Sequence, residues 1–183
     1  MSRQESLEEL HQEIRHCENC HLYKTRTHTV VGEGPVDARL MFVGEAPGRE
    51  EDKTGRPFVG RSGELLIDLL NKIGLSRESV FITSVLKCRP PGNRTPRKEE
   101  IETCLPYLHR QIEIVRPDII VLLGGVATSS LIGPWKLSDA HGRFYEANGD
   151  AYFITYHPAA ALRFPKMKSR IEKDFEILEG ELK

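Results

Sequence analysis

Apolar residues occur along the chain in two patterns, as short continuous runs and at helical spacing. Short apolar runs, which predict β-strands, occupy residues 39–44, 80–86, 118–123 and 151–156. The second and third runs are continuous and rich in β-branched residues, which is typical of strands buried on both faces of a sheet. The longer segments between them carry apolar residues at helical spacing. The pattern therefore predicts strands that alternate with helices.

Helix-start signals precede the periodic segments. These signals are a serine or threonine N-cap, a glutamate three residues later, and a proline in the first turn. The helix that opens near Pro96 is expected to end at Arg116, because the following proline disfavours helical geometry in the residue before it. The chain offers start signals at Ser6 with Glu9, at Ser62, at Thr95 with Pro96, and at Ser169.

Alternating strands and helices form right-handed βαβ units, which build a mainly parallel sheet covered on both faces. The chain has no internal repeat, low-complexity tract or linker, so residues 1–183 are expected to form a single α/β domain. Ligands in such sheets bind beyond the carboxyl ends of the strands. A site is therefore expected in the segments that follow Val43, Leu86, Leu123 and Tyr156.

Composition limits the class of protein. Of the 183 residues, 39% are hydrophobic and 29% are charged, as in ordinary globular proteins and unlike disordered chains. No apolar run approaches the roughly 18 residues that would span a bilayer, and the polar start lacks the apolar core of a signal peptide. We therefore expect no membrane association, a cytoplasmic location and a monomer. Lys and Arg number 26 against 27 Asp and Glu, which excludes a uniformly basic protein but leaves room for a local basic face.

Four cysteines form a candidate ligand set. Cys17 and Cys20 make a Cys-x2-Cys pair, and Cys88 and Cys104 lie far along the chain. Disulfides are rare in the cytosol, and an adjacent Cys-x2-Cys pair is more typical of metal ligation. Four thiolates can hold a tetrahedral zinc ion or an iron–sulfur cluster, and the spacing does not separate the two.

Two of the expected ligand-binding segments contain candidate chemistry. Residues 44–63 are rich in glycine and proline, which let the backbone approach a ligand closely, but they match neither Gly-x-Gly-x-x-Gly nor a Walker A sequence. His157 follows the last predicted strand at the same edge of the sheet. Each signal has an ordinary structural explanation by itself, and together they favour a binding site.

Four motifs carry a resemblance to a known family. The motifs are Gly-Glu-Ala-Pro-Gly at 44–48, Thr-Gly-Arg-Pro-Phe-Val-Gly at 54–60, Lys-Cys-Arg-Pro-Pro-x-Asn-Arg-x-Pro at 87–96 and His-Pro at 157–158. In this order they resemble the family 4 uracil-DNA glycosylases, from about Leu10 to the C-terminal helix. The resemblance implies a three-layer α/β/α fold with a four-stranded parallel sheet. It also implies a [4Fe-4S] cluster held by all four cysteines.

The resemblance implies how a site would work. These enzymes flip a deoxyuridine out of DNA and hydrolyse the bond between base and sugar. Phe58 would stack on the flipped base, and the backbone at Gly44, Glu45 and Ala46 would contact the uracil carbonyl oxygens. His157 would donate a hydrogen bond to the oxygen on which negative charge develops, as a neutral or a charged imidazole.

The chain departs from related patterns at two positions. Ala46 stands where family 1 enzymes carry the aspartate that positions water, which leaves Glu45 and Glu51 as candidates for that role. Ser84 stands where family members commonly carry an asparagine that reads the base, and losing such a bidentate reader weakens discrimination by roughly 1–3 kcal/mol. Either the base range broadens, for example to hypoxanthine, or a water replaces the amide and uracil stays preferred. Asn93 is expected to contact the substrate.

Basic residues near the expected site favour contacts with DNA phosphates. Lys87, Arg89 and Arg94 follow the second strand, and Leu162 or Arg163 is expected to fill the space that a flipped nucleotide leaves. Uracil-containing DNA, single- or double-stranded, is the expected partner, with a sliding clamp as a further candidate.

Three functions remain open at this stage. The favoured one is a monofunctional uracil-DNA glycosylase of base-excision repair. A non-catalytic DNA-binding iron–sulfur protein on the same fold is the second, because the asparagine and aspartate noted above are absent. An iron–sulfur redox protein is the third, although electron transfer has no use for Phe58 and His157 in a pocket.

Overall fold

The computed structural model describes residues 1–183 throughout. One sheet has the strand order β2-β1-β3-β5-β4. The strands are β1 (Leu40–Gly44), β2 (Phe81–Ser84), β3 (Ile119–Leu123), β4 (Arg143–Ala147) and β5 (Asp150–Thr155). The first four strands in this order are parallel, as the sequence predicts, and β4 runs antiparallel to β5. The four-stranded, wholly parallel sheet implied by the resemblance therefore gains a fifth strand, whose mostly exposed side chains give no apolar run.

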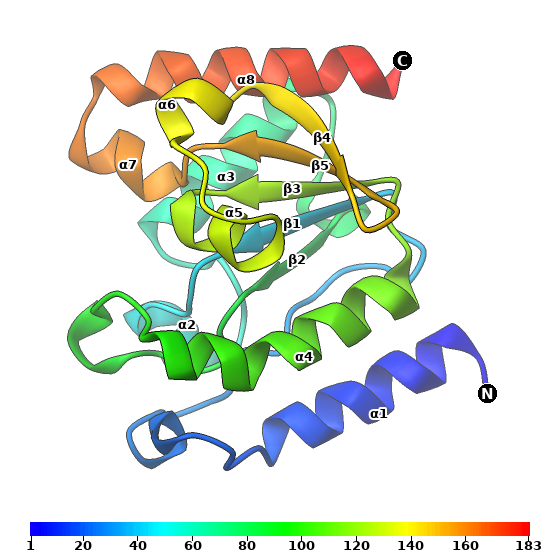
Figure 1. Cartoon of the computed structure of the whole chain (residues 1–183), viewed down its shortest axis with the longest axis vertical. Coiled ribbons are helices and arrows are strands. Elements are labelled where there is room, and N and C mark those ends of the chain that lie inside the picture. The colour runs from blue at the N-terminus through cyan, green and yellow to red at the C-terminus, as the bar shows by residue number, and fades with distance from the viewer.

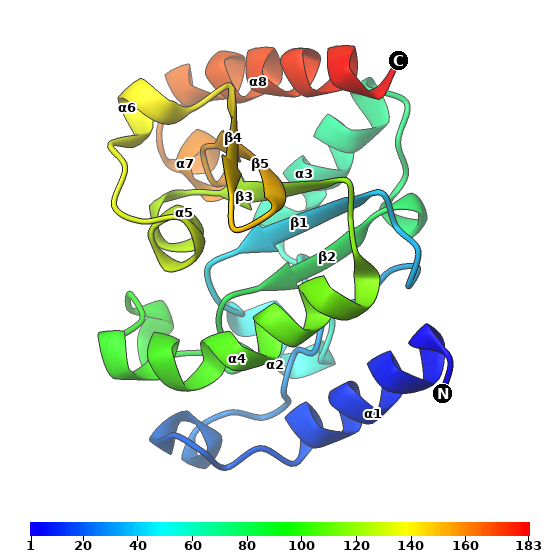
Figure 2. The same ribbon diagram turned by 45° about the vertical axis from the view of Figure 1, so that its right-hand side comes forward.

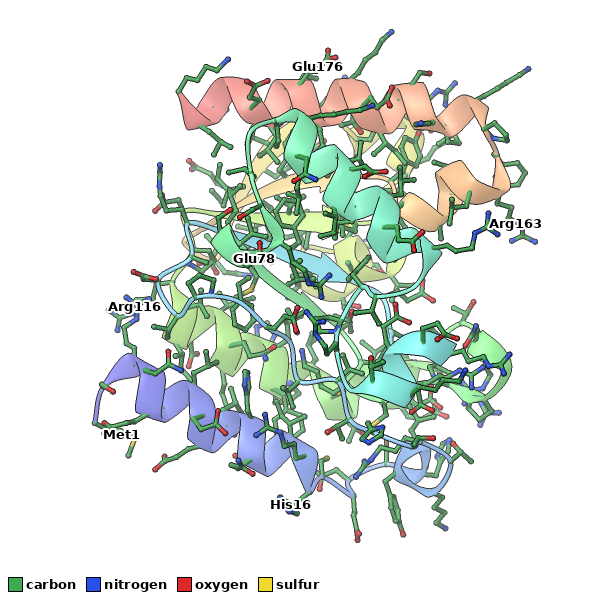
Figure 3. The ribbon with its side chains drawn as sticks, turned by 180° about the vertical axis from the view of Figure 1, so that it is seen from behind. Met1, His16, Glu78, Arg116, Arg163 and Glu176 are labelled. Carbon is green, nitrogen blue, oxygen red and sulfur yellow. The ribbon has the colours of Figure 1, made fainter.

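Helices cover both faces of this sheet (Figures 1 and 2). α3 and α8 pack on one face, and α4 and α5 pack on the other, with α1 against α4. Figure 3, the view from behind, looks onto α3. The helices are α1 (Arg3–Arg15), α2 (Arg49–Thr54), α3 (Arg61–Lys72), α4 (Lys98–Val115), α5 (Gly125–Leu131), α6 (Leu137–Ala140), α7 (Pro158–Arg163) and α8 (Lys166–Leu182).

Successive residues of β1 enter two different cores. Phe42 faces α3 and α8, where its ring lies 6.0 Å from that of Phe175. Met41 and Val43 point to the opposite face and pack with Ile112 of α4. Because side chains alternate along a strand, a strand covered by helices on both sides is apolar at every position. This explains the continuous apolar runs.

The first capping box lies one turn earlier than the sequence predicts. Ser2 Oγ accepts a hydrogen bond from the Glu5 N–H at 3.2 Å, and the Glu5 carboxylate accepts one from the Ser2 N–H at 2.7 Å. Ser6 therefore lies inside α1, where its hydroxyl donates to the Ser2 carbonyl. Three other predicted starts are wrong by less than one turn, since α3 begins at Arg61, α4 at Lys98 and α8 at Lys166.

The parallel strands end together at one edge of the sheet, on the left in Figure 1. The segments that leave this edge are those in which the sequence predicts a ligand site. No helix is both long enough and apolar enough to cross a membrane.

Candidate active site

A cavity of about 170 Å³ opens at the carboxyl edge of the sheet. Its wall joins the loops after β1, β2 and β5 with the segment between α2 and α3, so residues far apart in the sequence meet there. Among the residues that line it are eight that the sequence analysis singles out: Glu45, Ala46, Glu51, Phe58, Ser84, Asn93, Arg94 and His157.

Phe58 forms one wall of the cavity and is almost fully enclosed, with 7% of its surface exposed. Its ring stacks on the imidazole of His157, with centroids 5.5 Å apart. Gly44 provides the space, because a Cβ atom there would lie 2.6 Å from Cζ of the phenyl ring. The φ angle of Phe58 is +47°, a left-handed conformation that costs a bulky residue roughly 1–3 kcal/mol. Contacts elsewhere must therefore hold this residue in place.

His157 is present as a neutral imidazole with a defined tautomer. Its Nδ1 accepts a hydrogen bond from the backbone N–H of Ala159 at 3.0 Å and so caps α7. Burial lowers the pKa of His157 to about 4, so the ring is uncharged at neutral pH. Since Nδ1 is the acceptor, the proton lies on Nε2. The cavity therefore has a neutral N–H donor in its wall.

The Glu51 carboxylate accepts three hydrogen bonds from backbone donors. One oxygen accepts hydrogen bonds from the N–H groups of Val59 and Gly60, both at 3.1 Å, and the other accepts from Gly48 at 3.1 Å. Glu51 thereby joins the loop after β1 to the segment that carries Phe58. Glu51 lies in the cavity wall, as the sequence predicts, and its hydrogen bonds hold two loops together.

Glu45 and Ser84 have free polar groups in the same wall. The Glu45 carboxylate makes no hydrogen bond or ion pair within the chain, and burial raises its pKa. Ser84 ends β2, and a Cβ atom on Gly44 would lie 3.2 Å from its Oγ. Both groups are available to a bound molecule, whereas Asn93 Oδ1 already accepts a hydrogen bond from Arg89 Nε at 2.6 Å.

Comparison with known proteins matches residues 31–178 to the uracil DNA glycosylase superfamily. A type-4 uracil-DNA glycosylase of Pyrobaculum aerophilum is 45% identical over an alignment that covers 95% of this chain and 93% of that protein. The type-4 enzyme of Saccharolobus solfataricus is 48% identical, over 93% of this chain and 84% of its own length. That of Archaeoglobus fulgidus is 46% identical, over 97% and 94%. The chain belongs to the type-4 family of the uracil-DNA glycosylase superfamily.

The cysteines of this uracil-DNA glycosylase family member meet as the resemblance implies. All four line one small cavity of about 20 Å³, which Ile14 of α1 and Tyr107 of α4 also line. None is in a disulfide, and Arg26 donates a hydrogen bond to the Cys88 sulfur at 3.4 Å. No group of three or more His, Cys, Asp or Glu side chains is placed to hold a single metal ion. Four free thiols around one cavity, with a cation beside them, fit a group bound by four thiolates. The ligands would be Cys17, Cys20, Cys88 and Cys104.

The basic residues predicted to face DNA fall into two groups. Arg94 donates two hydrogen bonds to the buried Glu100, the shorter at 2.6 Å, and Lys87 is only 1% exposed. The Lys87 ammonium donates to Ser84 O, Thr83 Oγ1 and Gln111 Oε1, so the prediction that it contacts phosphate is wrong. The guanidinium Nη atoms of Arg89 have no partner within the chain.

Exposed apolar residues lie at the end of α7, the helix that follows His157. α7 follows His157 directly, and Leu162 near its end is 41% exposed. Phe164, for which the sequence predicts no role, is 59% exposed, and the Arg163 guanidinium lies 5.9 Å from its ring centroid. The sequence feature that could identify Phe164 is an aromatic residue between Arg163 and Pro165, where α7 ends and no core position is expected.

Proposed function

We propose that the chain removes uracil from DNA by hydrolysing the bond between base and deoxyribose, which leaves an abasic site for base-excision repair. Membership of the type-4 family supports this activity. The observation that carries it is the pairing of an enclosed aromatic ring, Phe58, with a neutral imidazole donor, His157, in the wall of one cavity.

Negative charge develops on the uracil as the bond breaks, so the site must stabilise an anion. Phe58 stacks on the flipped base, and the backbone from Gly44 to Ala46 contacts its carbonyl oxygens. The Nε2–H of His157 donates to the oxygen that gains charge. A fixed neutral donor strengthens its hydrogen bond as charge grows and needs no prior protonation. This pairing also makes an iron–sulfur redox protein the weaker proposal.

Glu45 positions the attacking water. The sugar becomes electron-poor as the base leaves, and a nearby carboxylate both orients water and stabilises positive charge. Glu45 has both oxygens free, whereas those of Glu51 are held by three backbone N–H groups. Glu51 therefore supports the geometry of the site, and Glu45 supplies the free carboxylate.

Ser84 and Asn93 line the cavity where the polar edge of the base would lie. The Ser84 hydroxyl donates or accepts one hydrogen bond, and a water completes the contacts that a longer amide would make. Uracil is thereby the preferred base. Excision of hypoxanthine is the alternative if Ser84 leaves room for a purine.

The four cysteines hold a [4Fe-4S] cluster. When bound, the cluster ties the segment after α1 to α4 and to the loop after β2, so its role is structural. The Cys104→Ser variant should lose the visible absorbance and unfold at a lower temperature than wild type. An unchanged spectrum and an unchanged iron content in that variant would contradict this ligand set.

DNA binding uses the exposed side chains of Arg89 and Arg163, with Arg94 fixing the loop after β2 through Glu100. Leu162 enters the base stack as the nucleotide leaves it. We propose that the chain acts as a single-domain monomer in the cytoplasm. A sliding clamp is the candidate protein partner.

The decisive experiment is an excision assay on end-labelled oligonucleotides, followed by alkaline cleavage at abasic sites. The substrates are uracil in single strands, opposite guanine and opposite adenine, with hypoxanthine opposite thymine and thymine opposite guanine. Cleavage at uracil alone is the expected result. Protein with an intact cluster that binds the DNA without cleaving it would favour a non-catalytic DNA-binding function.

A further inference from the structure

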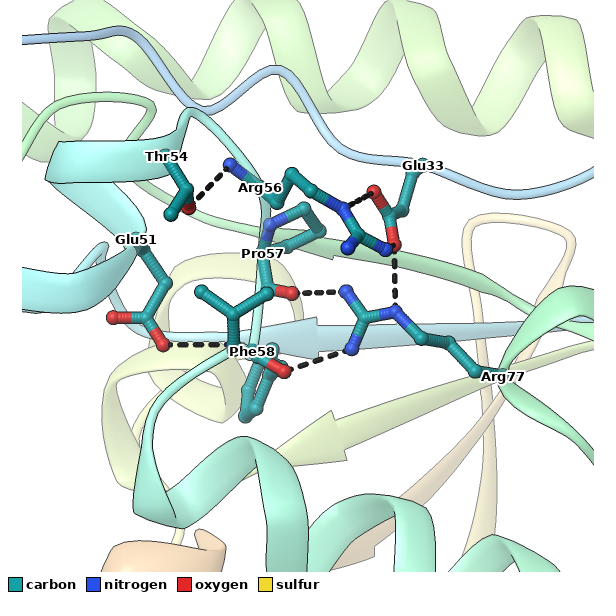
Figure 4. Close-up of polar contacts among 8 residues, drawn as sticks. Glu33, Glu51, Thr54, Arg56, Pro57, Phe58 and Arg77 are labelled. Carbon is teal, nitrogen blue, oxygen red and sulfur yellow. Dashed lines mark hydrogen bonds and ion pairs between the residues drawn. The ribbon is translucent and has the colours of Figure 1, made fainter.

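Arg77 lies beside the backbone of Pro57 and Phe58 (Figure 4). It opens the short 3-10 helix Arg77–Ser79 ahead of β2, and it does not line the cavity. Its side chain is nonetheless only 13% exposed. One guanidinium nitrogen, Nη1, donates to the carbonyl oxygen of Phe58 at 2.7 Å, and Nη2 donates to that of Pro57. A charged side chain is thus committed to two consecutive carbonyl groups.

These two carbonyl groups define the backbone conformation of Phe58. The Pro57 carbonyl belongs to the peptide plane before Phe58, and the Phe58 carbonyl belongs to the plane after it. The φ and ψ angles of Phe58 describe how these two planes are rotated, so one rigid guanidinium that binds both carbonyls restricts both angles. The second plane is held at its other end too, because Glu51 accepts a hydrogen bond from the Val59 N–H at 3.1 Å.

The conformation that Arg77 holds is one that phenylalanine avoids. With φ at +47°, Phe58 would relax toward an extended conformation if the contacts were removed, and its ring would leave the position above Gly44. The close approach of α3 adds to the constraint, since a Cβ atom on Gly63 would lie 2.0 Å from the Phe58 carbonyl oxygen. We propose that Arg77 is a positioning residue that keeps the Phe58 ring in place for the base. This inference rests on the proposed function.

Glu33 neutralises Arg77 and supplies a matched control. Its Oε1 accepts from Arg77 Nε at 2.6 Å, and its two oxygens accept from Arg56 at 2.9 and 3.1 Å. Arg56 therefore shares the same acidic partner, but its side chain is 58% exposed and its guanidinium binds neither carbonyl group. Loss of Arg56 removes a cation from Glu33 and leaves the backbone of Phe58 clamped.

The test measures single-turnover excision of uracil at saturating enzyme, so that weaker DNA binding does not affect the rate. Arg77→Ala should slow excision about ten- to hundred-fold, because a small misplacement at the reacting centre has that effect. Arg77→Lys keeps the positive charge but lacks the planar guanidinium that binds both carbonyl groups. Its excision rate should lie between those of Arg77→Ala and wild type. Arg56→Gln should excise at the wild-type rate.

Two further measurements separate positioning from general stability. In a Phe58→Ala background, Arg77→Ala should change the rate by less than about two-fold, because it acts through a ring that is no longer there. Methylguanidinium should restore part of the Arg77→Ala rate, and potassium chloride at equal ionic strength should not.

Three outcomes would overturn the inference: a wild-type rate for Arg77→Ala, an equal loss in the two backgrounds, or equal slowing by Arg56→Gln. If Arg77→Ala does not fold, Arg77→Lys with and without Phe58→Ala decides by the same comparison. A wild-type protein that excises no uracil would instead overturn the proposed function, and this inference with it.

Discussion

The Nδ1 atom of His157 accepts a hydrogen bond from the backbone N–H of Ala159 at 3.0 Å. This bond makes the imidazole an N-cap of α7 and commits its remaining proton to Nε2. The family resemblance implies that His157 stabilises an anion, and the structure shows that the same residue starts a helix. Its two nitrogens have separate tasks, and each can be tested.

The first prediction concerns the protonation state of His157. The folded protein lowers its pKa to about 4 from an ordinary 6.5, so the ring should stay neutral, with its proton on Nε2, from pH 5 to pH 8. The unfolded chain binds the proton more readily, so this residue should reduce the free energy of unfolding as the pH falls from 6.5 towards 4. Nitrogen NMR of labelled histidine checks the first point, with His157→Asn to assign the signal. A His157 signal that titrates near pH 6.5 would show that a charged imidazole is accessible.

The second prediction separates capping from catalysis at His157. Asparagine is a good N-cap, so His157→Asn should unfold near the wild-type temperature, whereas His157→Ala should lose about 0.5–2 kcal/mol of stability. Both variants should slow excision by about 10²–10³-fold, because each lacks the Nε2–H donor. The visible absorbance of the cluster should persist in both. Wild-type excision by His157→Asn would show that the cap is the main role of this residue.

The third prediction contrasts the two acidic candidates. Glu45→Gln should slow excision by about 10²–10⁴-fold with little loss of stability, because the carboxylate is free. Burial raises the pKa of Glu45, so the wild-type rate should fall on the acid side as this carboxylate is protonated, and that fall should be absent in Glu45→Gln. Glu51→Gln should mainly lower stability, since an amide nitrogen cannot accept the backbone hydrogen bonds. A larger rate loss in Glu51→Gln than in Glu45→Gln, without unfolding, would reverse these roles.

The sequence predicts the location of the cavity, because the positions of the strands and of their carboxyl ends depend on local patterns. The apolar runs place the carboxyl ends of β1, β2 and β5, and these ends bring Glu45, Ser84 and His157 together. It does not predict β4, because an edge strand with exposed side chains has no apolar run.

The sequence does not predict which hydrogen bonds individual side chains make. Glu51 and Lys87 are charged residues in a predicted polar region, and only the tertiary structure shows that each makes three hydrogen bonds within the chain. No sequence pattern predicts the role of Arg77, because it lies far in the sequence from the carbonyl groups that it binds. Such contacts depend on how separate elements pack, which local periodicity does not encode.

The fourth prediction concerns base choice at Ser84. Ser84→Asn should raise the preference for uracil over hypoxanthine by about ten-fold, because an amide supplies a donor and an acceptor in place of one hydroxyl. Ser84→Ala, the matched control, removes the hydroxyl without adding bulk and should lower the uracil rate. Competition between the two substrates in one reaction gives the ratio directly. An identical ratio in wild type and both variants would show that Ser84 does not read the base.

The fifth prediction concerns the exposed residues after α7. Leu162 and Phe164 are 41% and 59% exposed, although burial of either side chain would be favourable. The free-energy cost of this exposure is offset only when DNA is bound and the apolar residue enters the base stack. Leu162→Ala and Phe164→Ala should therefore leave the unfolding temperature unchanged. At least one of them should slow excision from double-stranded DNA more than from single strands, because a single strand has no stacked partner to hold open. The exposed Ile177→Ala on α8 is the control, and equal effects on both kinds of DNA would argue against insertion.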